Sequence, residues 1–168
     1  MHVRHALIAV AVAASCLTAC GSQQPAAVAA APAAKPARPL TVTDPWVKTA
    51  KKGMSAAFGT LVNHTAAPIT VVSAATVASP MVELHETVEI DGQMKMRPKE
   101  GGFVIPANGS LELKPGGNHI MLMGVAKPVL PGSQLEFTLK FADGATMEFT
   151  AVGKDFAGAN EKYQPGHG

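Results

Sequence analysis

Residues 85–124 read HETVEIDGQMKMRPKEGGFVIPANGSLELKPGGNHIMLMG, and this stretch carries the strongest indications of the fold. Short apolar runs alternate in it with turn dipeptides that contain Gly. Asp91-Gly92 separates two of these runs, and such a dipeptide is a strong signal for a β-hairpin. No stretch of helical period longer than a couple of turns competes with the strands. The segment therefore predicts several short strands joined by tight turns.

The same pattern extends outward from this stretch in both directions. Its runs are separated by many of the 16 Gly and 13 Pro residues, which are typical turn formers. The runs that we expect to form strands are 40–43, 46–48, 56–63, 69–76, 81–88, 89–90, 93–97, 103–105, 110–113, 119–123, 134–141 and 146–152. They predict an all-β domain, a two-sheet antiparallel β-sandwich with Greek-key connections. We assign residues 41–153 to this domain and residues 154–168 to a flexible C-terminal tail.

Residues 1–20 have the features of a lipoprotein signal peptide. Arg4 precedes an apolar run, residues 6–14, that is too short to cross a bilayer as a permanent helix. The run leads into Leu17-Thr18-Ala19-Cys20, which resembles a bacterial lipobox, so we expect cleavage before Cys20 and lipidation of its thiol. The alternative is an ordinary soluble export signal with an incidental Cys, or cleavage at another position. The lipidated form is exported and anchored to a membrane of the cell envelope, facing the periplasm or the cell exterior.

Residues 21–40 are rich in Ala and Pro and contain almost no large apolar side chain. Such a segment cannot bury enough surface to offset the entropy lost on ordering, so we expect a disordered tether. The chain has two Cys residues, Cys16 in the removed segment and Cys20 at the lipid anchor. The exported domain is therefore expected to have neither a free thiol nor a disulfide.

The composition argues against several classes of function. The formal net charge is +2, and no stripe of Lys and Arg is interleaved with aromatic residues, so nucleic acid is not expected as a partner. Neither a Gly-x-Ser-x-Gly nor a His-Glu-x-x-His motif occurs, and the acidic residues near His85 alternate along a predicted strand rather than converge. We therefore do not expect an enzyme.

The chemistry of the chain is concentrated in thioethers and imidazoles. Four of the eight Met and two of the six His lie between residues 85 and 123. In the strand 119–123, period two places His119, Met121 and Met123 on one face. Met94 and Met96 share a face in the same way. Pairing of these strands could bring together four candidate metal ligands, namely His85, Met96, His119 and Met121, with Met94 and Met123 as candidate auxiliary ligands.

Two imidazoles and two thioethers form a soft and mostly neutral set of ligands. This set suits Cu(I), whereas Mg²⁺ and Ca²⁺ require oxygen ligands and zinc usually recruits thiolate, further His or carboxylate. The competing interpretation is that Met fills gaps in an ordinary core and that each His is simply hydrogen-bonded. A blue-copper electron carrier is disfavoured because its site needs a Cys thiolate.

The segment that contains these candidate ligands resembles the PCuAC family of periplasmic copper chaperones. The family motif is a His, a Met about ten residues on and a His-x-Met about twenty residues later. The matching residues here are His85, Met96, His119 and Met121, and Asp44-Pro45-Trp46-Val47 matches the start of the family's domain. The resemblance covers about 40–152. Glu86 departs from the pattern, since family members often have Met directly after the first His.

The resemblance implies a cupredoxin-like sandwich that binds Cu(I) in an exposed and exchangeable site, and it leaves Cu(II) open as a second form of the ion. It also implies delivery of copper to an exported cuproprotein, such as a cytochrome c oxidase subunit or an assembly factor. The alternative from another class of function is an envelope lipoprotein whose β-sandwich serves adhesion or interaction and binds no metal.

Overall fold

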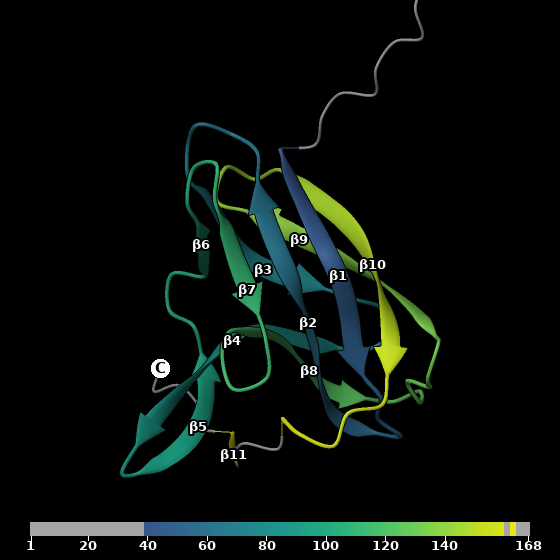
Figure 1. Cartoon of the computed structure of the whole chain (residues 1–168). Helices are drawn as coiled ribbons and strands as arrows, with labels where there is room; N and C mark the ends of the chain where they lie inside the picture. Colours follow the sequence, from purple (N-terminus) through teal and green to yellow (C-terminus); the bar gives the residue numbers. More distant parts are fainter. Residues whose placement is uncertain (1–38, 160–161, 164–168) are drawn as a thin grey trace, which may run out of the picture. The chain divides into compact units, whose positions relative to one another are not determined.

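The computed structural model describes residues 39–159 and 162–163 of the chain. Within these residues every regular element is a strand, so the all-β prediction is confirmed (Figure 1). The strands are β1 (Leu40–Lys48), β2 (Gly53–Asn63), β3 (Ile69–Ala75), β4 (Met81–Ile90), β5 (Gln93–Pro98), β6 (Phe103–Ile105), β7 (Ser110–Leu113), β8 (His119–Val125), β9 (Gln134–Phe141), β10 (Thr146–Lys154) and β11 (Lys162–Tyr163). The expected signal peptide, residues 1–20, and nearly all of the tether lie outside the described residues.

The strands follow one hydrogen-bonded order, β11-β5-β4-β8-β2-β1-β10-β9-β3-β6, with β7 paired to β2 beside this path. Strands far apart in the chain are neighbours, as Greek-key connections require, and β8 lies between β4 and β2. The sheet folds over on itself, because Val71 of β3 and Leu84 of β4 belong to the same buried cluster. This arrangement is the predicted β-sandwich.

Two of the strand pairs are parallel, which the antiparallel prediction did not include. β1 pairs with β10 in parallel, and β11 pairs with β5 in parallel, whereas the other strand pairs of the described chain are antiparallel. A parallel pair cannot be joined by a tight turn and needs a long connection. The local turn signals from which the prediction was made therefore could not reveal these two pairs.

Period-two alternation builds the core. In β9 every second side chain is buried, and Phe137 stacks on Phe149 of β10 with ring centroids 5.2 Å apart. Full burial of one such side chain contributes about 1.5–3 kcal/mol. Leu40, placed at the end of the predicted tether, is fully buried in this core, so the folded part begins one residue before the expected boundary.

The β4–β5 hairpin forms at Asp91-Gly92, as the sequence predicts. Asp91 has a φ of 54° and Gly92 a φ of 70°, and two successive positive φ angles are typical of the type I′ turn. The turn sets the register, so that Ile90 is opposite Gln93 and Thr87 is opposite Met96. The two predicted runs 81–88 and 89–90 form one continuous strand in the structure.

The segment after the sandwich contains more pairing than the expected tail. β10 continues to Lys154, and Lys162 and Tyr163 pair with Lys95 and Met96 of β5. Phe156 lies edge-on to Trp46, with ring centroids 5.4 Å apart. Described parts of 154–168 thus lie against the domain, and the flexibility of this segment stays a prediction.

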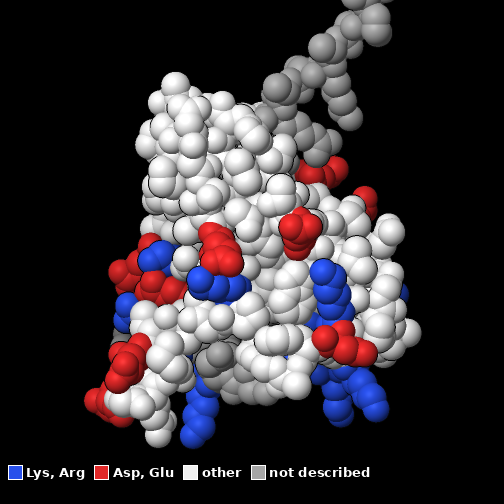
Figure 2. Space-filling view, in the orientation of Figure 1, with Lys and Arg blue, Asp and Glu red and all other residues white. Residues whose placement is uncertain are grey.

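On the face shown in Figure 2, charged side chains gather over the half of the domain that carries β4, β5 and the lower strand ends. The end that carries β6 and its neighbouring loops is almost uncharged on this face. Within 39–159 and 162–163, the structure has no helix that is long and apolar enough to span a membrane.

Candidate metal centre

Strand register brings the four predicted ligands to one face of β5, β4 and β8. His85 of β4 is directly opposite His119 of β8. Directly opposed residues share a face, and so do residues two apart in one strand. Met121 therefore joins His119 on this face, and Met96 joins His85 because it is opposite Thr87. The structure thus brings the β4–β5 hairpin together with β8, which is separated from it in the sequence by β6 and β7.

All four side chains are almost completely buried, so the candidate ligands are not exposed as the family resemblance implies. His85 is 0% exposed, His119 2%, Met121 3% and Met96 5%. The rings of His85 and His119 have centroids 5.5 Å apart and meet edge to face. Met96, His119 and Met121 line a cavity of about 320 Å³, whose wall also includes Phe58 of β2. His85 does not line this cavity.

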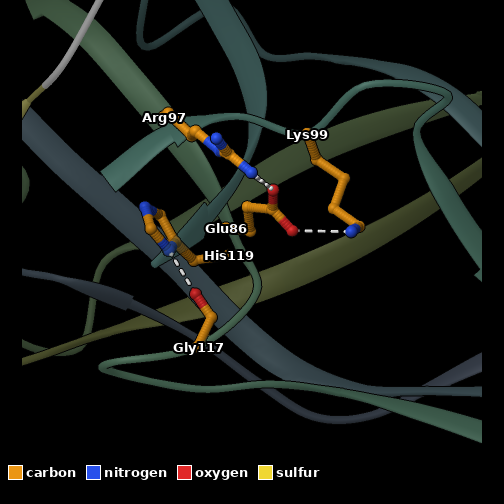
Figure 3. Close-up of polar contacts among 5 residues, drawn as sticks. All are labelled: Glu86, Arg97, Lys99, Gly117 and His119. Atoms are coloured by element: carbon orange, nitrogen blue, oxygen red, sulfur yellow. Dashed lines mark hydrogen bonds and ion pairs between the residues drawn. The ribbon is translucent and has the colours of Figure 1, made fainter. Parts of the chain in front are cut away.

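Hydrogen bonds define the tautomer of each imidazole. The Nε2 atom of His85 lies 2.7 Å from Glu83 Oε2, and a carboxylate can only accept, so Nε2 carries the proton. The Nδ1 atom of His119 lies 3.0 Å from the carbonyl oxygen of Gly117 and donates to it (Figure 3). In the neutral rings the lone pairs are therefore on His85 Nδ1 and His119 Nε2. Ligating His residues are commonly held in this way by an outer acceptor.

One of these lone pairs is buried without a partner. Among the described residues, no donor reaches His85 Nδ1, which is inaccessible to solvent. A buried polar atom of this kind carries a desolvation cost of about 1–3 kcal/mol unless something else satisfies it. A metal ion bound at Nδ1 would do so. The residues therefore fit a cation that accepts nitrogen and sulfur donors.

The types of side chain near His85 and His119 decide which metal ions the site could bind. In the part of the chain that the structure describes, no group of three or more His, Cys, Asp and Glu side chains could hold a metal ion. Any site at His85 and His119 therefore needs thioethers to complete it, which favours Cu(I) over zinc or calcium. Both Cys residues precede residue 39, so the described residues offer no thiolate for a blue-copper site.

The two candidate auxiliary ligands lie elsewhere on the strands. Met94 is 48% exposed and is opposite Glu89 near the hairpin turn. Met123 is opposite Met81, beyond Met121 in β8. Neither side chain lines the cavity. Their role as ligands stays a prediction, and their positions give it no support.

Glu86, the departure from the family motif, belongs to the opposite face. Its carboxylate is 2.6 Å from Lys99 Nζ and 3.0 Å from an Arg97 guanidinium nitrogen (Figure 3). The hydrogen bond from Lys99, helped by Arg97, lowers the pKa of Glu86 despite partial burial, which acts in the opposite direction. Glu86 is therefore a structural ion-pair partner that points away from the candidate ligands.

Sequence reasoning assigned no role to three residues beside the site. Glu83 accepts a hydrogen bond from the ring of His85. The spacing Glu-x-His, which places both side chains on one face of a strand, could have indicated this contact. Met54 lines the cavity although it lies outside the Met-rich stretch. Tyr163 stacks on His85 with ring centroids 5.5 Å apart and an interplanar angle of 5°. The pairing of β11 with β5 is non-local, so no sequence pattern could have placed Tyr163 there.

Comparison with known proteins gives a consistent set of relatives. The family profile described as "Putative lipoprotein LpqE-like" matches residues 40–152. A protein of Leifsonia xyli subsp. xyli (strain CTCB07), named "Putative lipoprotein Lxx21020", is 43% identical over 148 residues, which is 88% of each chain.

Two solved structures extend this comparison. "Solution structure of CuI-DR1885 from Deinococcus Radiodurans" is 32% identical, with a TM-score of 0.54, and covers 74% of this chain and 85% of that one. "Copper-bound PCuAC domain from PmoF2" shares the fold at 17% identity, with a TM-score of 0.57, and covers 71% of this chain and 95% of that one.

Proposed function

The chain belongs to the LpqE-like family, which is of the PCuAC type, and from this membership we propose that it is an extracytoplasmic copper chaperone. Its cargo is Cu(I), held by His85, Met96, His119 and Met121. The protein carries the ion rather than catalysing a reaction.

The observation that carries the proposal is the buried face shared by two oriented imidazoles and two thioethers. Register places His85 opposite His119, and hydrogen bonds to Glu83 and Gly117 leave a ring lone pair on each histidine. The relatives support the choice of metal, because two similar solved structures, the PmoF2 domain and CuI-DR1885, are copper-bound.

The ligand chemistry suits transport. Thioethers bind Cu(I) selectively and add no negative charge to the site. They release a monovalent cation more readily than thiolates do. Hydrogen bonds to Glu83 and to the Gly117 carbonyl hold the two imidazoles in fixed orientations. Cu(II) prefers nitrogen and oxygen donors, so we expect a weaker interaction with the oxidised ion.

Location and partner follow from the same proposal. We place the protein in the cell envelope, anchored to the membrane through Cys20, and the lipoprotein description of the family and of the Leifsonia relative supports this. The acceptor is an exported copper-requiring protein, such as a cytochrome c oxidase subunit or an assembly factor for it.

Copper titration tests the site directly. Purified protein is titrated anaerobically with Cu(I) in the presence of a competing chelator. We expect one tightly bound ion, and we expect the double variant His119→Ala/Met121→Ala to bind it at least about 100-fold more weakly, about 2.7 kcal/mol. Met81→Ala is the control, because Met81 is 51% exposed and does not line the cavity.

X-ray absorption on the loaded protein counts the ligands, and two nitrogen and two sulfur neighbours are expected. A double variant that binds copper as tightly as the unaltered protein would show that the site is wrongly assigned. Absence of copper binding altogether would favour the alternative of an adhesion or interaction sandwich.

A further inference from the structure

The candidate cavity contains a third thioether that the family motif does not include. Met54, the second residue of β2, lines the cavity together with Met96, His119 and Met121. Its side chain is 55% exposed, whereas Met96 and Met121 are 5% and 3% exposed. The same cavity therefore holds one thioether in contact with solvent and two that are buried.

Strand geometry explains why Met54 faces this cavity. Ala56 of β2 is directly opposite Met121, and period two places Met54 on the same face as Ala56. At Met54 the register shifts, because Gly53 is opposite Val125 while Ser55 is opposite Leu122. Two residues of β8 thus oppose one residue of β2, which is a β-bulge.

A glycine at the bulge provides the backbone conformation that this bulge requires. Gly124 of β8 has a φ of +77°, a conformation that L side chains rarely adopt. Bulges bend the strand and redirect neighbouring side chains, and they occur often beside functional sites. Here the bulge lies opposite Met54, where β2 begins, at the solvent side of the buried ligands.

An exposed thioether next to buried ones has a clear use in metal transfer. Cu(I) moves between proteins by ligand exchange, in which a new donor binds before an old one leaves. No redox change is involved, since one Cu–S bond forms and another Cu–ligand bond breaks while copper remains Cu(I). Buried ligands are hard for a partner protein to reach. A donor at the surface of the cavity can bind the ion between the partner and the buried ligands, and so increase the rate of transfer.

We propose that Met54 is a transfer ligand, a thioether that contacts Cu(I) at the cavity mouth and passes it between a partner and the buried set Met96, His119 and Met121. This inference rests on the proposed function. It adds a residue outside the motif and assigns it to the entry and release of copper. The partner side of the exchange is any donor that can reach an exposed Met, such as a thioether or an imidazole.

Other exposed methionines provide a matched comparison. Met81 is 51% exposed, close to the value for Met54, but it does not line the cavity. Leu preserves the size and apolar character of Met and removes the sulfur. Met54→Leu and Met81→Leu therefore differ in whether a sulfur is lost inside the cavity or outside it.

The first measurement follows the methionine methyl groups by NMR. The protein is labelled with ¹³C at the methionine methyls and titrated anaerobically with Cu(I). We expect the Met96 and Met121 signals to shift until one equivalent of Cu(I) per protein has been added. The Met54 signal should shift or broaden with them, while the Met81 signal stays in place. A Met54 signal that does not respond while Met96 and Met121 shift would overturn the inference and leave the proposed function intact. If Met96 and Met121 do not respond either, the proposed function itself fails.

The second measurement is kinetic. Copper-loaded protein is mixed with a strong Cu(I) chelator in a stopped-flow instrument. We expect Met54→Leu to release copper about tenfold more slowly, with a loss of equilibrium affinity of about threefold or less. Met81→Leu is expected to match the unaltered protein in both. Unchanged release from Met54→Leu would refute the transfer role. A loss of affinity as large as that of Met121→Leu would also refute it, because Met54 would then be a permanent ligand.

Discussion

The β4–β5 hairpin has two faces that differ sharply in chemistry. One face carries His85 and Met96, which are buried. The other carries Glu86 and Arg97, which form an ion pair with the Arg97 side chain 48% exposed. In each strand the two kinds of residue are direct neighbours in sequence. Because successive side chains point to opposite faces, each strand carries a candidate metal ligand on one face and a member of the ion pair on the other.

The comparison shows why the alternation matters for a copper carrier. A carboxylate without a partner on the face of His85 and Met96, here called the ligand face, would offer an oxygen donor that suits harder cations. Glu86 avoids this by facing the other way, where Lys99 and Arg97 neutralise it. On the ligand face, the carboxylate of Glu83 is bonded to the ring of His85 and orients it.

Among single substitutions on the two faces of the hairpin, the largest effect is expected when Glu83, the acceptor on the ligand face, is removed. Glu83→Ala takes away the partner of His85 Nε2, so the ring loses its fixed tautomer and orientation. We expect Cu(I) affinity to fall by about 10–100-fold, as is typical for outer acceptors of ligating His residues. Chelator competition measures the change. Glu83→Gln retains a carbonyl acceptor and should recover part of the affinity. Equal losses in both variants would mean that charge, rather than the hydrogen bond, is what matters.

The second prediction removes one sulfur from the same face. Met96→Leu keeps the volume and apolar character of the side chain, so the free energy of unfolding should change by less than about 1.5 kcal/mol. Cu(I) affinity should fall by about tenfold or more, which corresponds to about 1.4 kcal/mol. Urea unfolding and copper titration on the same sample separate the two effects. Undiminished affinity would remove Met96 from the ligand set.

On the opposite face of the hairpin, a substitution should affect stability and not copper binding. We expect Glu86→Gln to leave copper binding unchanged and to lower the free energy of unfolding at pH 7 by about 0.5–1 kcal/mol, since ion pairs near the surface contribute little. The folded-state pKa of Glu86 lies below its ordinary value of 4.5. Its contribution is therefore complete above the pKa of the unfolded chain and is lost as pH falls through the folded-state pKa.

Denaturant unfolding at several pH values checks this linkage. The difference between Glu86→Gln and the unaltered protein should be present at neutral pH and should shrink in acid, where Glu86 is protonated. A difference that stays constant down to pH 3 would mean that the ion pairs with Lys99 and Arg97 are not its source.

The smallest effect is expected at the edge of the ligand face. Tyr163→Leu removes the ring that stacks on His85, and such an aromatic pair contributes about 0.5–1.5 kcal/mol beyond its buried area. Because Tyr163 belongs to a strand of only two residues and is half-buried, we expect a loss near 0.5 kcal/mol, at the lower end of this range. Tyr163→Phe should show no loss. Hydrogen exchange at β11 would detect release of the strand even where the unfolding curve barely moves.

Much of the fold could be read from local patterns. The turn at Asp91-Gly92, the strands around it and the face taken by each of His119, Met121 and Glu86 follow from turn chemistry and from period two, which depend only on near neighbours in sequence. The four ligand candidates were identified for the same reason, with the family resemblance adding weight to His85 and Met96. The ligand set itself stays a proposal.

The positions of distant strands were decided only by the tertiary structure. The insertion of β8 between β4 and β2 sets His85 opposite His119 and brings Met54 to the same cavity. The parallel pairing of β11 with β5 places Tyr163 on His85. No local pattern encodes such contacts, because the register between distant strands is set by packing of the whole core. The sequence by itself determined which side chains share a face of a strand, and the packed sandwich determined which faces meet.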